Sequence, residues 1–436
     1  MCLNHSLQLT IEKLIYGGDG LALLPADEHG RGKAVFLPFV LEGEKIRAEL
    51  IEEKPGFSRA KVENILQPST QRIEPRCPYF QRCGGCHYQH ARYEHQLEIK
   101  AAILEENLRR IAKLELEREL IVHPSPPWNY RNRTRLKVRC APEFAVGYYK
   151  FNSHEFLAVK ECPISSPLIN RAIVALSGWG GGEGCWLQEI ELFADAEDSQ
   201  LLIELYCSPG ISKAAAHRLA GEVRGILPEA AGAVVFESQA ADKSWKTREA
   251  KQLAAAGATE LTYNVGPVAY RVSAGAFFQV NRHGVGELTR LVTQEYSGAT
   301  VLDLYAGGGL FSTALASTFA QVIAVEPSQT SHADLVHNSP ENVEAVRATS
   351  EQYLRRKARK FDLVVVDPPR SGLGENVVPE LAELNPPRLV YVSCDPATLA
   401  RDLSGFLSRG YHVEQAHLVD LFPQTYHLES VFVLAR

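Results

Sequence analysis

The sequence predicts an α/β protein of several domains, with a doubly wound parallel sheet in its C-terminal part and a small β-barrel at its N-terminal end. In residues 266–436, apolar strands, Gly-rich turns and helical segments alternate, which is the rhythm of a doubly wound sheet. In residues 1–70, apolar and polar residues alternate with period two instead. The chain has 436 residues, of which 45% are hydrophobic and 22% charged, and this composition suits a globular protein of about two to four domains.

Residues 1–70 are predicted to form short strands joined by tight turns. Leu7 and Leu9 alternate with polar neighbours, and residues 45–50 repeat that pattern. The glycine-rich segment 17–20 supplies a turn. A strand-rich unit of this size suggests a small barrel of the kind often used to bind RNA, and the alternative is a β module without a ligand.

The cysteines indicate a metal site rather than a disulfide framework. There are nine, an odd number, and the start of the chain lacks the features of a secretory signal, so we expect a reducing, cytoplasmic setting. Cys77, Cys83 and Cys86 form a C-x5-C-x2-C cluster, and Cys162, which also precedes a proline, is the best candidate for a fourth ligand. Four thiolates hold either zinc or an iron–sulfur cluster, and the spacing leaves both open.

Residues 93–114 are predicted to be helical, because apolar residues recur there with helical spacing. The predicted buried face consists of Tyr93, Leu97, Ala101, Leu104, Leu108 and Ile111. The following residues 121–265 mix strands, helices and Gly/Pro turns, which indicates a separate α+β domain.

A basic stripe opens this central part of the chain. Its members occupy alternate positions: Arg131, Arg133, Arg135, Lys137 and Arg139. In a strand, all five side chains point to one face. Trp128 and Tyr130 precede the stripe, and a cationic strand with aromatic neighbours suits a phosphate backbone with unstacked bases. We therefore expect RNA contact here, although an ordinary solvated strand face is the alternative.

The C-terminal part contains a turn typical of nucleotide-type cofactors. An apolar strand reaches Asp303, and the three glycines of residues 307–309 let the backbone approach a ligand and direct helical N–H groups toward it. Glu326 ends the next predicted strand, where a carboxylate accepts ribose hydroxyls. Ser312 stands where the last glycine of G-x-G-x-x-G would be, which favours S-adenosylmethionine over NAD. The cysteine spacing differs from the C-x3-C-x2-C of radical enzymes, so we expect a polar methyl donor.

Reactive side chains follow two further predicted strands and begin a third. Asp367 and Cys394 each follow an apolar strand, and ligands bind at the carboxyl ends of such strands. Cys394 is therefore a candidate nucleophile, with Arg370 as the neighbouring cation that favours its thiolate. The alternative is a buried, inert cysteine. Glu429 begins the predicted last strand, where a carboxylate is able to take a proton.

Five longer motifs carry a family resemblance. They are C-x5-C-G-G-C-x2-Q-H from Cys77, Y-R-N at 130–132, F-F-Q-V-N at 277–281, D-P-P-R at 367–370 and S-C-D-P-A-T-L-A-R-D at 393–402. With these motifs the chain resembles, over essentially its whole length, the RNA uracil-5-methyltransferases that use S-adenosylmethionine and carry a [4Fe–4S] cluster. It looks closest to the members that act on 23S ribosomal RNA, which have an N-terminal TRAM barrel.

The resemblance implies a role for each matching residue. Cys394 is implied to be the nucleophile and Glu429 the base, with Asp367 beside the reacting groups. The implied cofactor site consists of Gln279, Tyr305, Gly307, Gly309, Leu310, Glu326 and Asp367. The implied ligands of the cluster are Cys77, Cys83, Cys86 and Cys162. Two residues depart from the family pattern, since Leu310 and Asp395 each stand where Asn is common in relatives. Leu310 bears on a side-chain contact to the cofactor, and Asp395 bears on how the catalytic loop is held.

The resemblance also implies a domain division and a reaction. Residues 1–70 would form the TRAM-like barrel, residues 71–90 and 122–265 the iron–sulfur and RNA-binding domain, and residues 91–121 and 266–436 the methyltransferase domain. We expect a cytoplasmic monomer with no membrane association that methylates C5 of a uridine in 23S ribosomal RNA through a covalent bond from Cys394 to C6. The alternatives are a transfer RNA substrate, a cytosine-5-methyltransferase, an NAD-dependent oxidoreductase and a non-catalytic RNA-binding protein.

Overall fold

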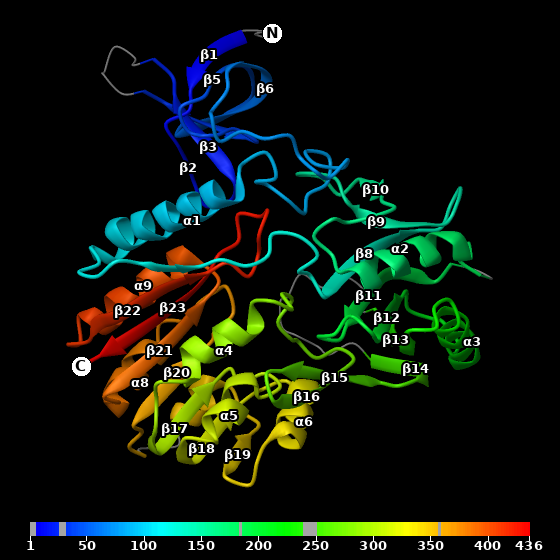
Figure 1. The fold of residues 1–436 in the computed structure, drawn as a ribbon, viewed down its shortest axis with the longest axis vertical. Helices are drawn as coiled ribbons and strands as arrows, with labels where there is room; N and C mark the ends of the chain where they lie inside the picture. Colours follow the sequence, from blue (N-terminus) through cyan, green and yellow to red (C-terminus); the bar gives the residue numbers. More distant parts are fainter. Residues whose placement is uncertain (1–5, 26–31, 183–184, 239–250, 356–358) are drawn as a thin grey trace.

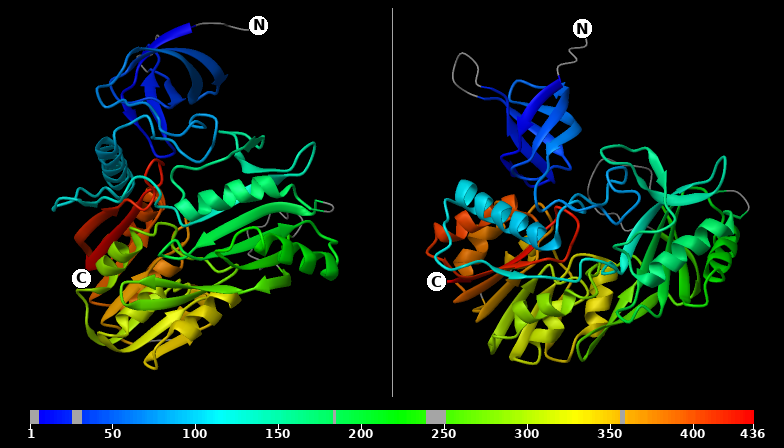
Figure 2. Two further views of the ribbon diagram at one scale, coloured as in Figure 1. Left: turned by 45° about the vertical axis from the view of Figure 1, so that its right-hand side comes forward. Right: turned by 45° about the horizontal axis from the view of Figure 1, so that its top comes forward.

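The computed structural model describes residues 6–25, 32–182, 185–238, 251–355 and 359–436. Its strands form sheets of six, seven, two and eight strands within these ranges. The six-stranded sheet lies at the top of Figure 1, the seven-stranded sheet to the right, and the eight-stranded sheet at the lower left. Figure 2 shows the N-terminal sheet above helix α1 (Tyr93–Asn107) and the last loops of the chain.

The N-terminal strands confirm the period-two pattern read from the sequence. They are β1 (Ser6–Thr10), β2 (Lys13–Leu14), β3 (Asp19–Leu23), β4 (Ala34–Pro38), β5 (Lys45–Glu53) and β6 (Phe57–Gln67), in the order β1-β5-β6-β4-β3-β2. Leu9, Ile46 and Ala48 point inward and share one small apolar cluster with Val35 and Leu37. The sheet thus has its own core, separate from the larger clusters of the molecule.

Helix α1 confirms the helical prediction, but its predicted buried face is only partly right: Leu104 and Leu108 are buried, whereas Tyr93, Leu97 and Ala101 are half-buried. The helix continues into the π-helical turn η1 (Leu108–Ala112), and its buried residues are Gln96, Ile99, Lys100, Ile103 and Leu104. Ile111, predicted to be buried, is 42% exposed. The periodicity misled because two polar side chains lie on the buried face, where each of them finds hydrogen-bond partners.

The central part forms a seven-stranded sheet covered by two helices. Its elements are β8 (Arg133–Arg139), β9 (Ala145–Tyr149), β10 (Phe156–Ala158), β11 (Leu187–Ala194), β12 (Leu201–Cys207), β13 (Ala230–Glu237) and β14 (Lys251–Gly257), with helices α2 (Pro167–Trp179) and α3 (Lys213–Arg224). The strand order is β10-β9-β8-β11-β12-β13-β14. Cys140 and Cys185, which are not among the predicted ligand cysteines, pair as a disulfide beside β11, although the expected reducing setting disfavours such bonds.

The C-terminal sheet is mixed rather than parallel throughout. Its strands are β17 (Gly298–Leu304), β18 (Phe319–Val325), β19 (Val343–Val346), β20 (Leu363–Val366), β21 (Arg388–Ser393), β22 (His412–Val419) and β23 (Glu429–Ala435), joined by β7 (Ile121–His123) from earlier in the chain. The order is β19-β18-β17-β20-β21-β23-β22-β7. Strands β17 to β21 pair in parallel, whereas β23 runs antiparallel between β21 and β22. The direction of winding reverses between β17 and β20, which is where ligands bind in such sheets.

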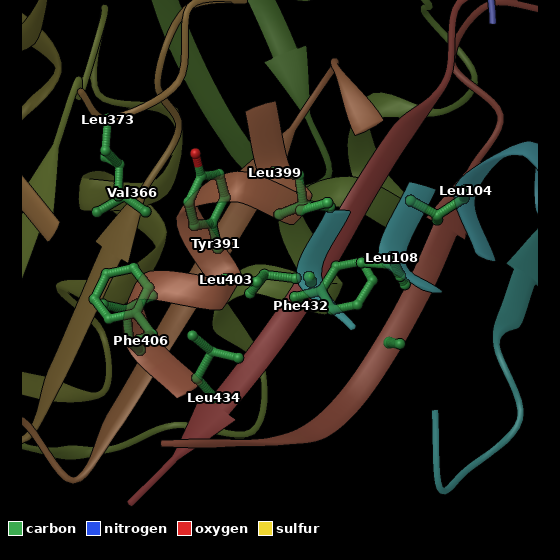
Figure 3. Packing of buried hydrophobic residues seen from close by; sticks show 14 of the residues in the cluster. Leu104, Leu108, Val366, Leu373, Tyr391, Leu399, Leu403, Phe406, Phe432 and Leu434 are labelled. Atoms are coloured by element: carbon green, nitrogen blue, oxygen red, sulfur yellow. The ribbon is translucent and has the colours of Figure 1, made fainter. Parts of the chain in front are cut away.

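Helices cover both faces of this sheet. One face carries α4 (Val285–Thr293), α5 (Leu310–Leu315) and the hairpin of β15 (Glu260–Val265) and β16 (Val268–Ser273). The other face carries α8 (Val377–Leu384), α9 (Pro396–Leu407) and α1. Helices α6 (Gln329–Asn338) and α7 (Ser350–Leu354) follow β18 and β19. Figure 3 shows Leu104 of α1, Leu403 of α9 and Phe432 of β23 in the same apolar layer.

None of the helices in the described ranges has the length and hydrophobicity needed to span a bilayer.

Candidate active site

The glycine turn after β17 lies directly against Glu326, at the end of β18. The Gly307 N–H donates to Glu326 Oε2 at 2.9 Å, and the Ser328 N–H donates to Oε1 at 2.9 Å. These two bonds fix the carboxylate between the turn and the start of α6. Carboxylate oxygens accept more than one hydrogen bond each, so the group is suited to ribose hydroxyls as well.

Close backbone packing gives the turn its shape. Gly309 has φ +91°, and a Cβ there would lie 2.9 Å from the side chain of Leu335, so a larger residue would be both strained and crowded. Tyr305 also adopts a left-handed conformation, with φ +64°, and its ring packs partly buried against the apolar layer of α9. A left-handed Tyr is uncommon, and such strain concentrates at ligand sites.

Leu310 does not behave as a cofactor contact should. Its side chain is buried in the apolar cluster beneath α4 and α5, and its carbonyl oxygen accepts a hydrogen bond from the Tyr270 hydroxyl at 3.0 Å. This placement fits the departure noted in the sequence, where Leu310 replaces the Asn common in relatives and a side-chain contact to the cofactor is lost; Leu310 as part of the cofactor site stays a prediction.

Two carboxylates lie side by side at the winding reversal, of which Asp303 is buried and Asp367 half-buried. Asp303 is near the end of β17 and Asp367 follows β20, the neighbouring strand. Burial raises the pKa of Asp303 to about 7, partly offset by a hydrogen bond from the Ser312 hydroxyl. Burial and the charge of Asp303 raise the pKa of Asp367 to about 7 as well. The pair therefore holds a proton near neutral pH.

Strand pairing brings Cys394 and Glu429 together. Ser393, the last residue of β21, pairs with Ser430 of β23, so the next position on each strand places Cys394 beside Glu429. Burial raises the pKa of the Cys394 thiol to about 12, and the charges of Glu429 and Asp367 add to this effect. Arg370 is the neighbouring cation expected from the sequence and lowers the pKa of Cys394, but the effect of burial is larger.

Glu429 is fully enclosed at the start of β23, with 4% of its surface exposed. Burial raises its pKa well above the usual value, Asp367 raises it further, and Arg370 opposes both. The pKa values of the Cys394 thiol and the Glu429 carboxyl group are therefore both raised, chiefly by burial. Two adjacent groups with elevated pKa values are typical of sites that move protons during a reaction.

The loop after Cys394 is held by Asp395, one of the two departures from the family pattern. Its carboxylate caps α9 by accepting from the Ala397 N–H at 3.0 Å and the Thr398 N–H at 2.9 Å. Asp and Asn are about equally good at this position of a helix. The departure therefore leaves the loop capped.

The four predicted ligand cysteines come together around one cavity. Cys77, Cys83, Cys86 and Cys162 line a space of about 220 Å³ beside β8. The Cys77 N–H donates to Gln89 Oε1 at 3.0 Å, and the Cys162 N–H donates to Asn170 Oδ1 at 2.7 Å. Burial raises the pKa of the Cys83 thiol to about 11. Among the residues that the structure describes, no three His, Cys, Asp or Glu side chains lie close enough together to bind a single metal ion.

The basic stripe is largely neutralised within the protein. Arg133 is buried in ion pairs with Glu191 and Glu204 on the neighbouring strands β11 and β12. Strand β11 also neutralises two further members of the stripe. Arg135 pairs with Glu189 and Glu191, and Lys137 pairs with Glu189. The expectation of five cations open to RNA is therefore wrong for these three.

The other two members of the stripe lie differently. Arg131 precedes β8 and lines the cysteine cavity. Arg139 is exposed at the end of β8, over the ring of Phe156.

The Y-R-N and F-F-Q-V-N motifs are neighbours in the fold. The Asn132 N–H donates to the Val280 carbonyl at 3.0 Å, and the Arg282 N–H donates to the Tyr130 carbonyl at 3.0 Å. On its other side, Arg131 donates its N–H to the Ile164 carbonyl, close to the cysteine cavity. Gln279, which is 8% exposed, therefore lies on a segment that is joined to the central domain by backbone hydrogen bonds.

Comparisons with known proteins agree with this geometry. Residues 258–436 match the family model described as tRNA (Uracil-5-)-methyltransferase. An uncharacterized RNA methyltransferase of Aquifex aeolicus is 32% identical over 99% of this chain and 99% of its own length, and one of Clostridium acetobutylicum is 31% identical over 99% and 97%.

A solved structure shares the fold. The tRNA (uracil-54, C5)-methyltransferase of Pyrococcus abyssi, in complex with S-adenosyl-L-homocysteine, superimposes with a TM-score of 0.75 at 23% identity, covering 98% of this chain and 100% of that one. The chain thus belongs to the same family of RNA methyltransferases as these relatives, and its own C-terminal part matches the tRNA (Uracil-5-)-methyltransferase model.

Proposed function

We propose that this RNA methyltransferase transfers the methyl group of S-adenosylmethionine to C5 of a uridine in RNA. The observation that carries the proposal is the placement of Cys394 beside Glu429, next to Asp367 on the neighbouring strand and two strands away from the glycine turn. A thiol, a carboxyl group and a cofactor turn at one sheet edge are the parts that this reaction requires.

The residues around the turn fit the cofactor. Glu326 would accept the ribose hydroxyls, and the backbone of residues 307–309 would allow close approach. Tyr305, Gln279 and Asp367 would line the rest of the site. S-adenosylmethionine, when bound, would supply an electrophilic methyl group on a positively charged sulfonium.

Cys394 would act first, as a thiolate. Its sulfur adds to C6 of the uracil, forming a C6–S bond, and the electrons of the C5–C6 double bond move toward C5 and the O4 carbonyl. C5 would thereby become the nucleophile that takes the methyl group, the bond between that methyl group and the sulfonium sulfur would break, and S-adenosylhomocysteine would leave. Because the thiol pKa is high in the free protein, the thiol proton must pass to solvent as RNA binds.

Glu429 would act second, as the base. Its ionised carboxylate removes the proton from methylated C5, the C5–C6 double bond re-forms, and the Cys394 thiolate leaves C6. The uracil ring must reach Cys394 directly, so we propose that the target uridine is flipped out of its stack or lies in an RNA loop.

We propose 23S ribosomal RNA as the substrate, with transfer RNA as the alternative. The ribosomal proposal rests on the resemblance of the whole chain, including a separate six-stranded sheet at residues 6–67, to ribosomal RNA enzymes with a TRAM barrel. The alternative is favoured by the tRNA description of the matching family model. We assign RNA binding to residues 1–70 and to the central region 71–90 and 122–265, and catalysis to residues 91–121 and 266–436.

We also propose that the cysteine cavity holds a [4Fe–4S] cluster. Four thiols around one cavity are the ligand set that such a cluster requires. The cluster would have a structural role, because its ligands come from loops and not from the strand ends that carry Cys394 and Glu429.

Radiolabelled S-adenosylmethionine and unmodified ribosomal or transfer RNA test the function directly. We expect 5-methyluridine at one site, mapped by mass spectrometry of nuclease fragments. Cys394→Ala should lose methylation entirely while S-adenosylmethionine still binds in calorimetry. Full activity of Cys394→Ala would rule out the covalent route, and methylated cytosine in place of uridine would rule out the proposed substrate base.

A further inference from the structure

A tyrosine of the N-terminal sheet reaches the backbone of the proposed nucleophile. Tyr16, in the turn between β2 and β3, donates its hydroxyl to the Cys394 carbonyl oxygen at 3.1 Å. The two residues are 378 positions apart in the chain. Within the described ranges, the Cys394 carbonyl receives no other hydrogen bond. Tyr16 is therefore a direct link between the N-terminal sheet and the catalytic loop.

The turn that carries Tyr16 is firmly seated. Gly18 has φ +92°, and a Cβ at this position would lie 3.0 Å from the Cβ of His87, so the turn backbone lies tight against that side chain. The ring of Tyr16 meets that of Tyr426 edge to face, with centroids 5.4 Å apart, and the ring centroids of His87 and Tyr426 lie 4.6 Å apart. Burial raises the pKa of the Tyr16 hydroxyl, so it remains a donor at neutral pH.

This hydrogen bond completes the fixation of one peptide unit. The peptide between Cys394 and Asp395 has its N–H bonded to Ser393 Oγ at 3.2 Å and its carbonyl bonded to Tyr16. The orientation of a peptide plane sets the backbone angle ψ of the residue before it, here Cys394, and thereby the direction of the Cα–Cβ bond that carries the sulfur. A peptide bonded at both ends holds the sulfur in one direction.

We propose that Tyr16 positions the Cys394 sulfur for attack on C6, so that the N-terminal sheet forms part of the active site. The inference rests on the proposed function. Tyr16 touches only the backbone of the nucleophile and is a positioning residue rather than a catalytic one. Its loss should slow the covalent step and leave the binding of RNA and S-adenosylmethionine unchanged.

Tyr16→Phe tests this inference with RNA that contains 5-fluorouridine. The C5 fluorine cannot leave as a proton does, so the covalent protein–RNA adduct accumulates and its formation rate is measured directly. At saturating RNA and S-adenosylmethionine, we expect the rate to fall about 3- to 10-fold, the range for one hydrogen bond. The dissociation constants of RNA and S-adenosylmethionine should be unchanged.

Tyr88→Phe is the matched control, since the Tyr88 hydroxyl is buried nearby without a hydrogen-bond partner. It should form the adduct at the wild-type rate. A wild-type rate for Tyr16→Phe, an equal slowing in both variants, or a loss confined to RNA affinity would each overturn the inference. If the wild-type protein itself forms no adduct with any RNA, the proposed function has failed instead.

A pair of glycine variants gives a second test. Gly17 and Gly18 both have positive φ, of 109° and 92°, so Ala at either position brings similar backbone strain. A Cβ at Gly17 meets nothing within 4 Å, whereas one at Gly18 meets His87. Gly18→Ala should therefore displace Tyr16 and slow adduct formation more than Gly17→Ala does. Equal rates in the two variants would count against positioning by this turn.

Discussion

The ionisation of Cys394 depends on its burial more than on any cation beside it. Arg370 favours the thiolate, but burial and the carboxylates of Glu429 and Asp367 together raise the thiol pKa to about 12. A thiol this weakly acidic is almost entirely protonated at pH 7. The free enzyme is therefore protected from adventitious alkylation or oxidation until substrate changes the site.

Alkylation of Cys394 by iodoacetamide should consequently show a steep pH dependence. Below the thiol pKa, the thiolate fraction rises about tenfold per pH unit, so the rate should climb steadily from pH 7 to pH 9 without a plateau. Mass spectrometry of the peptide that contains Cys394 measures it. Glu429→Gln removes a negative neighbour, lowers the thiol pKa and should speed alkylation at each pH. A plateau near pH 8.5 in the wild-type protein would contradict an elevated pKa.

The sequence located the reactive residues better than it described their surroundings. Cys394 was predictable because it follows an apolar strand whose end is evident from the pattern, whereas Glu429 was predictable only through the family resemblance. The neutralisation of Arg133 was not predictable, because Glu191 and Glu204 lie on strands whose pairing with β8 follows from the fold alone. The same holds for the raised pKa of Asp303 and Asp367, which depends on the adjacency of β17 and β20.

At the scale of elements, helix α1 is joined to the catalytic sheet by a buried ion pair. Lys100 Nζ lies 2.6 Å from Asp420 Oδ1, with both side chains fully buried, and it also donates to the Phe422 carbonyl at 3.0 Å. Burial lowers the pKa of Lys100, and Asp420 opposes that effect. This lysine lies on the part of the buried face of α1 that the apolar pattern left out, which is why the predicted face was only partly right.

Lys100→Ala should destabilise the protein strongly. The substitution leaves the Asp420 carboxylate buried without its partner, a change that costs about 3–5 kcal/mol in the free energy of unfolding. Urea unfolding followed by circular dichroism measures the loss. The double variant Lys100→Met with Asp420→Asn removes both charges and should recover most of it. A loss below about 1 kcal/mol for Lys100→Ala would show that the ion pair does not anchor the helix.

At the scale of the whole molecule, loops from three regions meet beside the sheet edge that carries Cys394. The N–H groups of His87 and Tyr88, next to the cysteine cluster, donate to the Gln424 carbonyl at 2.9 and 3.0 Å. Gln424 lies in the loop that leads into Glu429, and the Tyr130 hydroxyl donates to the Pro423 carbonyl in the same loop. These contacts join residues hundreds of positions apart, so no local pattern in the sequence predicts them.

This connection makes the cysteine site a support for the loop before Glu429. If Cys77, Cys83, Cys86 and Cys162 bind a cluster, the cluster fixes the loop that ends at His87 to the central domain. Because the His87 N–H donates to the Gln424 carbonyl, the cluster also restrains the loop that leads into Glu429. Cys83→Ser should remove the brown colour and the absorbance near about 400 nm, and amide hydrogen exchange of residues 421–428 should then become faster. Cys207→Ser is the control, because Cys207 is buried in β12, away from that cavity, and its loss should leave the absorbance unchanged. A colourless wild-type protein would contradict the cluster, and unchanged exchange in a bleached Cys83→Ser protein would separate the cluster from the catalytic loop.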